Sequence, residues 1–389
     1  MISKRMENLQ PYVPGEQPKD RDYVKLNANE NPYPPAPEVL DALTDFIRCE
    51  PMRLALYPDP DSSALKAAIA DMLNCTGGVL CRADTTSGTC RPAPEDAIPF
   101  AVTPDMIYTG NGSDEVLSFL FYAFFDTQTP LVFPEHTYSF YPVYSAFYGI
   151  KTLRIPLKSD WRLDTDALIR SAAKNKSPVI IANPNAPTGR ALSREDVRRV
   201  LSSVPKNCVF AVDEAYADFG GQSCIPLLAE FPNLVIVRTF SKSFSAAGIR
   251  LGFLAASPKL IRAVTTVKNS VNHFPVDALA QTAGIALCRS TAYYAGCAKK
   301  IVCERDDFLT FLQSHGWNAV PSLTNFVFAS HPSVPGKEVY RRIKDAGILV
   351  RHFNMPGIEN FVRITIGTPE QMRLVKEAIK NHLSDRSAP

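Results

Sequence analysis

The stretch Leu234-Val235-Ile236-Val237-Arg238-Thr239-Phe240-Ser241-Lys242 decides the fold. Its apolar run predicts a buried strand, and Lys242 follows just beyond the carboxyl end of that strand. Ligands bind at this end of the strands in open α/β sheets. Ser241 and Arg250 would add a hydroxyl and a second cation, as a bound phosphate requires. Alone, Lys242 is more simply a solvated loop residue, so its function depends on the surrounding motifs.

Short β-branched runs alternate with helical stretches from about residue 105 to residue 257. This alternation favours an α/β fold with a mostly parallel sheet and helices on both faces. After about residue 275 the pattern changes and predicts a smaller α+β lobe with a closing helix. The expected strands are Met106-Ile107-Tyr108, Leu131-Val132-Phe133, Val179-Ile180-Ile181-Ala182, Val209-Phe210-Ala211-Val212, Leu234-Val235-Ile236-Val237 and Gly252-Phe253-Leu254, then Asn325-Phe326-Val327-Phe328, Ile348-Leu349-Val350 and Val362-Arg363-Ile364-Thr365-Ile366.

Three parts follow from these patterns. We expect an N-terminal arm over residues 1–30, a large ligand-binding domain over 31–275 and a small C-terminal domain over 276–389. Residues 1–35 are rich in Pro, Asn and charge, which is typical of an irregular arm on the surface.

The segment 74–99 has a foreign composition, with the pair Gly77-Gly78, three cysteines and a run rich in Thr, Ser, Gly and Pro. We interpret it as a mobile surface insertion. Its cysteines lack the close pairing of a zinc site and have no nearby histidine, so we expect no metal. These cysteines are Cys75, Cys81 and Cys90.

Composition excludes several classes of protein. The 389 residues carry a net charge of +3, which gives no field to recruit nucleic acid or an anionic membrane. The N-terminus lacks a signal-peptide pattern, and no apolar run reaches the ~18 residues of a membrane span. Nine scattered cysteines, an odd number, favour a reducing compartment. We therefore expect a cytoplasmic protein.

A second polar motif, Asp213-Glu214-Ala215-Tyr216, follows the apolar run that ends at Val212. A carboxylate there would be a plain ion-pair partner of a lysine, or it would hold a pyridine nitrogen protonated. In the second case the Tyr216 hydroxyl would bond the phenolic oxygen of the same ring.

A third motif, Thr109-Gly110-Asn111-Gly112-Ser113-Asp114-Glu115, opens an apolar helix. Small residues at a helix start expose backbone N–H groups to an anion, and the helix dipole adds to the attraction. The motif lacks the third glycine of the dinucleotide fingerprint and the Lys of a P-loop, which disfavours a plain dinucleotide-binding module. It supports a phosphate cradle of another kind.

Two remaining motifs are less specific. The run Asn183-Pro184-Asn185-Ala186-Pro187-Thr188-Gly189 has an ordinary explanation as a chain reversal. Arg363 lies between apolar strand residues, where a cation is costly unless an anion meets it. A carboxylate is a natural partner because it pairs with guanidinium in bidentate fashion.

Together these motifs resemble the fold-type I pyridoxal-phosphate-dependent aminotransferases, and within them the histidinol-phosphate aminotransferases, from about Tyr12 to the final helix. The matching motifs are Leu26-Asn27-Ala28-Asn29-Glu30, Tyr57-Pro58, Gly112-Ser113-Asp114-Glu115, Pro184-Asn185-Ala186-Pro187-Thr188-Gly189, Asp213-Glu214-Ala215-Tyr216, Thr239-Phe240-Ser241-Lys242 with Arg250, and Arg363-Ile364-Thr365-Ile366-Gly367-Thr368.

The resemblance implies a large domain that binds pyridoxal 5′-phosphate and a smaller α+β C-terminal domain. It implies catalytic roles for three residues. Lys242 would hold the cofactor covalently and move protons, Asp213 would pair with the pyridinium nitrogen, and Tyr216 would bond the ring oxygen. The other implied cofactor-binding residues are Gly112, Ser113, Asp114, Ser241 and Arg250 at the phosphate, Tyr138 stacked on the ring, and Tyr57 from the neighbouring subunit of a homodimer.

For the substrate, the resemblance implies that Arg363 clamps a carboxylate or phosphate with help from Arg351, Tyr12 and Asn29. The chain departs from the family at Ala186, where an asparagine usually bonds the ring oxygen. We expect Asn185, one residue earlier, to take that role.

The implied reaction is amino transfer from L-histidinol phosphate to 2-oxoglutarate in histidine biosynthesis. Threonine-phosphate decarboxylases and aromatic or broad-specificity aminotransferases share these motifs and stay as alternatives. A ligand-sensing transcription regulator built on the same domain would need an N-terminal DNA-binding domain, and the segment before Tyr23 is too short and too irregular for one.

Overall fold

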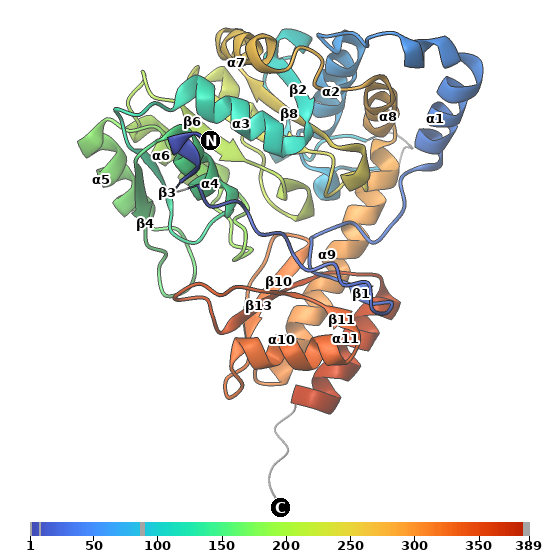
Figure 1. Ribbon diagram of the computed structural model, residues 1–389, viewed down its shortest axis with the longest axis vertical. Coiled ribbons are helices and arrows are strands. Elements are labelled where there is room, and N and C mark those ends of the chain that lie inside the picture. The colour runs from blue at the N-terminus through green and yellow to red at the C-terminus, as the bar shows by residue number, and fades with distance from the viewer. Residues whose placement is uncertain (1, 8, 86–89, 384–389) are drawn as a thin grey trace, which may run out of the picture.

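The computed structural model describes residues 2–7, 9–85 and 90–383, which form two lobes (Figure 1). The large lobe is built on a seven-stranded sheet with the order β2-β8-β7-β6-β5-β3-β4. Its strands are β2 (Ile107–Asn111), β3 (Leu131–Pro134), β4 (Thr152–Ile155), β5 (Val179–Ala182), β6 (Phe210–Asp213), β7 (Leu234–Thr239) and β8 (Leu251–Ala256).

The expected mostly parallel sheet is confirmed. Only β8 runs antiparallel to its neighbours, β2 and β7. Every predicted strand of this lobe is present, and the edge strand β4 is added to them. Successive residues of β5 belong to two different cores, because Val179 and Ile181 face one set of helices and Ile180 the other. The helices of this lobe are α1 (Pro37–Cys49), α2 (Ser63–Thr76), α3 (Gly112–Phe124), α4 (Phe140–Tyr148), α5 (Thr165–Asn175), α6 (Arg194–Ser203) and α7 (Pro258–Val271).

The small lobe contains an antiparallel sheet with the order β12-β13-β10-β9, as expected for an α+β unit. The long helix α9 (Thr291–Ser314) runs from the large lobe down into the small one (Figure 1). No described helix is long and apolar enough to cross a membrane. The remaining elements are α8 (Ala278–Arg289), α10 (Gly336–Asp345), α11 (Pro369–Leu383), β9 (Asn318–Val320), β10 (Phe326–Ser330), β11 (Ile348–Leu349), β12 (Arg351–His352) and β13 (Phe361–Thr365).

The N-terminal segment differs from the expected surface arm. Strand β1 (Val24–Lys25) pairs in parallel with β11, and this pairing fixes the segment on the small lobe. Leu26 and Asn29 are only 2% and 1% exposed. The blue trace runs from the large lobe to β1 beside the small lobe and then returns to the large lobe at α1 (Figure 1). The polar composition of residues 1–35 therefore did not indicate that Leu26 and Asn29 are buried.

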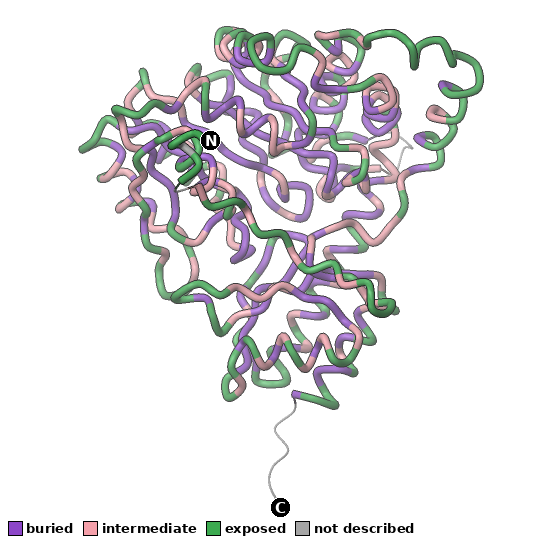
Figure 2. Tube along the Cα trace, viewed as in Figure 1, coloured by how far each residue is buried: buried purple, intermediate pink, exposed green. Residues whose placement is uncertain are grey.

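The interpretation of residues 74–99 as a mobile surface insertion is wrong for most of the segment, although residues 86–89 lie outside the described structure. The Leu80 N–H donates to Asp218 Oδ1 at 3.0 Å. The buried carboxylate of Asp96 accepts hydrogen bonds from Arg82 and Arg194, both at 2.6 Å. Leu80 and Asp96 are each only 1% exposed and so belong to the buried interior, which Figure 2 shows along the inside of the large lobe. The insertion is therefore an anchored part of the large lobe.

Candidate active site

The ends of strands β6 and β7 bring the predicted catalytic residues together. Asp213 is the last residue of β6 and pairs in register with Val237 of β7, and Lys242 follows the end of β7. Both residues line one cavity of about 370 Å³. Other predicted residues line it too, namely Ser113, Asp114, Tyr138, Tyr216, Ser241 and Arg250.

Asp213 is buried at the floor of this cavity. Its Oδ1 accepts the Ala215 N–H at 3.1 Å, and its Oδ2 accepts the Tyr141 hydroxyl at 3.0 Å. Burial raises the pKa of Asp213 to about 6 even though both hydrogen bonds lower it. A cationic partner would offset this burial cost, which suits a protonated ring nitrogen. Sequence reasoning missed Tyr141, because it lies in an apolar helical run that resembles ordinary core.

An anion cradle lies at the other end of the cavity, where helix α3 begins. Gly112 has φ +73°, and Arg250 lies beside this turn with its guanidinium 3.1 Å from Asp114 Oδ2. A Cβ atom on Gly252 of β8 would lie 2.5 Å from the Ser113 nitrogen, so the helix start and the strand are in close contact. The first N–H groups of a helix next to a guanidinium are suited to a phosphate.

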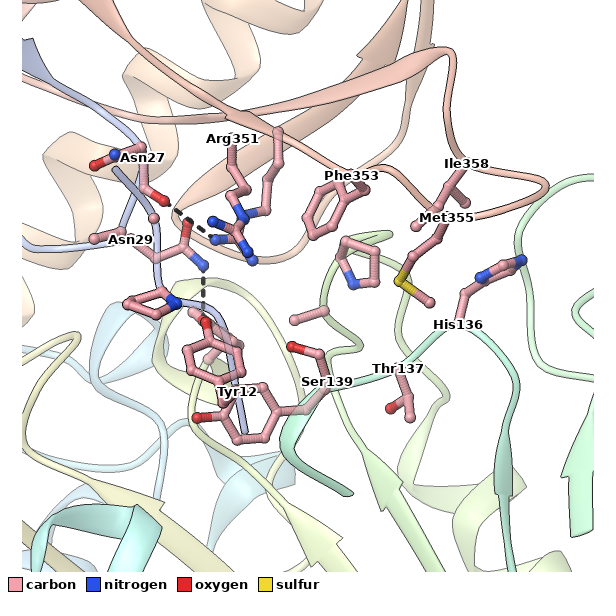
Figure 3. Close-up of a pocket in the computed structure, with 18 of the residues that line it drawn as sticks. Tyr12, Asn27, Asn29, His136, Thr137, Ser139, Arg351, Phe353, Met355 and Ile358 are labelled. Carbon is pink, nitrogen blue, oxygen red and sulfur yellow. Dashed lines mark hydrogen bonds between the residues drawn. The ribbon is translucent and has the colours of Figure 1, made fainter. Parts of the chain in front are cut away.

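A second cavity of about 200 Å³ opens toward the small lobe (Figure 3). It shares Lys242, Tyr216 and Tyr138 with the first cavity, so these side chains lie between the two. Burial raises the pKa of Tyr138 well above its ordinary value, which keeps its hydroxyl neutral. The predicted substrate residues Tyr12, Asn29, Arg351 and Arg363 all line this second cavity.

Arg351 and Arg363 stand directly opposite each other on β12 and β13. Arg363 has a buried Nε without a hydrogen-bond partner, and it forms no ion pair with any acidic residue in the described ranges. Burial lowers the pKa of Arg363, and the charge of Arg351 lowers it further. Like charges in directly opposed positions repel. An anionic ligand between them would relieve both costs.

Three predicted residues, Gly112, Asn185 and Tyr57, do not line either cavity, although Gly112 forms the turn directly before Ser113. Asn185 donates to the His136 carbonyl at 2.9 Å and to Thr188 Oγ1 at 3.0 Å, and it faces a separate small cavity. Ala186 lines the cavity of Asp213 and Lys242 instead, and the expected contact of Asn185 with the cofactor ring stays a prediction. Tyr57 is 83% exposed and stacks on Phe274 with ring centroids 4.6 Å apart. Its role across a subunit interface stays a prediction.

The chain matches the family model described as aminotransferase class I and II over residues 21–379. It is 44% identical to a histidinol-phosphate aminotransferase of Syntrophus aciditrophicus over 381 residues, which cover 98% of this chain and 97% of that protein. A crystal structure of a putative histidinol-phosphate aminotransferase from Erwinia carotovora atroseptica aligns with a TM-score of 0.78 at 26% identity, covering 92% and 95% of the chains. An Acinetobacter baylyi relative is 39% identical over 97% of this chain and 96% of its own length.

The fold and the site thus define a class I and II aminotransferase. At this identity over nearly its whole length, the chain belongs to the histidinol-phosphate aminotransferase family. It is an enzyme whose cofactor is pyridoxal phosphate and whose substrates are small molecules.

The residues present fit this cofactor. The cavity offers an amine at Lys242, a buried carboxylate at Asp213 for a ring nitrogen, and a hydroxyl at Tyr216 for a ring oxygen. The turn at Gly112 and the guanidinium of Arg250 supply an anion cradle at the opposite end. The amine suits an aldehyde, the carboxylate and hydroxyl suit a pyridine ring, and the anion cradle suits a phosphate.

Proposed function

We propose that the chain transfers the amino group of L-histidinol phosphate to 2-oxoglutarate in histidine biosynthesis. The products are 3-(imidazol-4-yl)-2-oxopropyl phosphate and L-glutamate. The observation that carries this proposal is the half-buried cation of Arg363, which has no acidic partner in the described ranges and lines the cavity that also contains Lys242. Both substrates present an anion to such a site, as the phosphate of one and the carboxylates of the other.

In this proposal Lys242 binds the cofactor covalently, and Asp213 and Tyr216 hold its ring. Gly112, Ser113, Asp114, Ser241 and Arg250 hold its phosphate, with Tyr138 against the ring. When bound, the cofactor withdraws electrons from the substrate and makes the proton on the substrate Cα removable.

Lys242 is placed to move that proton, because it lines both cavities and lies between Asp213 and the arginine pair. Its Nζ donates to the Ala28 carbonyl at 3.1 Å and is 5.9 Å from the centroid of the Tyr216 ring. An amine held here can take the proton from the substrate Cα and return it to a neighbouring atom. Arg363 and Arg351 would orient the substrate so that its Cα–H bond faces Lys242.

The far wall of the second cavity suits a flat, partly apolar ring. Phe353, Met355 and Ile358 line it (Figure 3). This wall supports an imidazole-bearing donor over threonine phosphate, which has no ring to pack there. An aromatic amino acid would also fit the wall, and the assay below distinguishes the two.

We also infer that the enzyme works in the cytoplasm as a homodimer, with Tyr57 reaching the neighbouring subunit. Residues 51–57 expose four large apolar side chains that are 55–83% accessible. Exposed apolar surface of this kind is typical of a contact between proteins. These side chains are Met52, Leu54, Leu56 and Tyr57. Nine free cysteines support a reducing compartment.

The proposal is tested in two steps on the purified protein. Borohydride reduction followed by digestion and mass spectrometry should find the cofactor on Lys242, and modification of another lysine would contradict the site. Rates are then compared for histidinol phosphate, threonine phosphate and aromatic amino acids, each with 2-oxoglutarate. Preference for an aromatic donor, or carbon dioxide release from threonine phosphate, would overturn the proposed substrate.

A further inference from the structure

Asn29 is held in one orientation by the small lobe. Its backbone N–H donates to Thr365 Oγ1 at 3.0 Å, and the same hydroxyl donates its only proton to Asn29 Oδ1 at 3.2 Å. The Asn29 carbonyl accepts the Asn325 amide at 3.0 Å. Asn29 is 1% exposed and has φ 55°, a left-handed conformation that asparagine tolerates better than most residues. The segment is therefore fixed in both position and polarity.

This arrangement determines which end of the amide faces the active site. Because the Thr365 hydroxyl has one proton and gives it to Oδ1, the Nδ2 group must point the other way. Nδ2 donates to the Tyr216 hydroxyl oxygen at 2.8 Å, the bond drawn from Asn29 in Figure 3. The Tyr216 hydroxyl oxygen thus accepts the hydrogen bond from Asn29. The hydroxyl proton of Tyr216 is left for a partner within the cavity.

We propose that Asn29 is a positioning residue that keeps the Tyr216 hydroxyl acting as a donor toward the ring oxygen of the cofactor. This rests on the proposed pairing of Tyr216 with that oxygen. Ala186 lines the cavity without a polar side chain, and Asn185 lines a different cavity. Neither residue places a donor in the cavity of Asp213 and Lys242, so the direction of the Tyr216 hydroxyl matters more. Asn29, which we expected to bind substrate, has both ends of its side chain engaged within the protein.

The test is the pH titration of the visible absorbance of bound cofactor, which follows the charge on the ring oxygen and its conjugated atoms. Asn29→Asp keeps the shape but makes the side chain an acceptor, which would draw the Tyr216 proton away from the cavity. Asn29→Gly removes the side chain without strain at φ 55°. Because a donor stabilises the deprotonated cofactor, Asn29→Asp should raise its titration midpoint by about one to two pH units. Asn29→Gly and Thr365→Val should raise it by less.

A double variant separates positioning from a general structural effect. In a Tyr216→Phe background, Asn29→Gly should cause no further shift, because the hydroxyl that it orients is gone. Midpoints equal to wild type in the Asn29 variants, or a shift from Asn29→Gly that persists in the Tyr216→Phe background, would overturn the proposal. If borohydride instead fails to fix the cofactor on Lys242, the proposed function itself fails, and this outcome is distinguishable from the first.

Discussion

A Cβ atom on Gly112 would lie 2.6 Å from Nη2 of Arg250. The turn before helix α3 therefore has no room for a side chain on the face where the guanidinium lies. Gly112 also has φ +73°, which other residues adopt only with strain. The glycine thus serves two purposes: it permits the turn, and it leaves room for the Arg250 guanidinium beside the start of the helix.

Gly112→Ala should weaken cofactor binding by at least about tenfold, because it adds backbone strain and displaces Arg250. The measurement is a titration of cofactor-free protein with pyridoxal phosphate. Gly296→Ala is the matched control, since nothing lies within 4 Å of a Cβ at that position in helix α9. Equal affinity in both variants would show that the turn does not hold the phosphate.

Asp213→Asn should change how the stability of cofactor-free protein depends on pH. Burial raises the pKa of Asp213 to about 6 in the folded chain, above its value of about 3.9 in an unfolded one. Folding therefore favours the protonated acid, and the stability present below about pH 4 is lost as the pH rises through about 6. The variant has no carboxyl group at this position to ionise. Its free energy of unfolding, relative to that of wild type, should therefore increase by up to about 3 kcal/mol from pH 4 to pH 7.

Urea unfolding of both cofactor-free proteins across that range measures the difference. A constant gap between the two proteins would mean that folding does not raise the pKa of Asp213. The same variant should bind cofactor more weakly than wild type, because an amide gives no counter-charge to the ring nitrogen.

Arg363→Ala should weaken substrate binding in both half-reactions by about ten- to a hundredfold, the loss of one charge-assisted hydrogen bond in a closed site. Cofactor content should stay unchanged, because Arg250 and the turn at Gly112 are untouched. Arg373→Ala, on the exposed face of helix α11, controls for loss of a cation from the small lobe. A variant with a lower Tm but unaltered substrate affinity would make Arg363 a structural residue.

Local patterns explain how much could be predicted from the sequence. Asp213 and Lys242 each lie at or just beyond the end of an apolar run, and parallel strands end at the same edge of a sheet. The local sequence was therefore enough to predict that these two residues lie close together. Strand β4 was missed because it is a short edge strand whose Arg154 breaks the apolar pattern.

What the sequence could not supply depends on contacts between distant residues. Asn29 and Thr365 are 336 positions apart, so nothing local indicates that Asn29 is buried or which way its amide points. Asn185 illustrates the converse, because one position along an irregular turn directs its side chain to a different cavity. Residues in turns have no fixed period from which such a direction could be predicted.

Tyr57→Ala and Lys242→Ala should each lose activity but recover part of it when their subunits are mixed. Tyr57 does not line either cavity of its own chain, and its ring lies on the exposed apolar segment of residues 51–57. If Tyr57 serves the neighbouring subunit, a mixed dimer contains one site with Lys242 from one chain and Tyr57 from the other. Random exchange would then restore roughly a quarter of wild-type activity, because half of the dimers are mixed and each has one intact site.

Asp213→Asn mixed with Lys242→Ala is the matched control for this recovery. These two residues line the same cavity of the same chain, so every site in their mixed dimer keeps one defect and activity should stay low. Subunit exchange is verified in both mixtures with differently tagged chains. Recovery in the first mixture and not in the second places Tyr57 across the interface. Low activity in both despite exchange would place its function within its own subunit, and full activity of Tyr57→Ala alone would exclude it from the site.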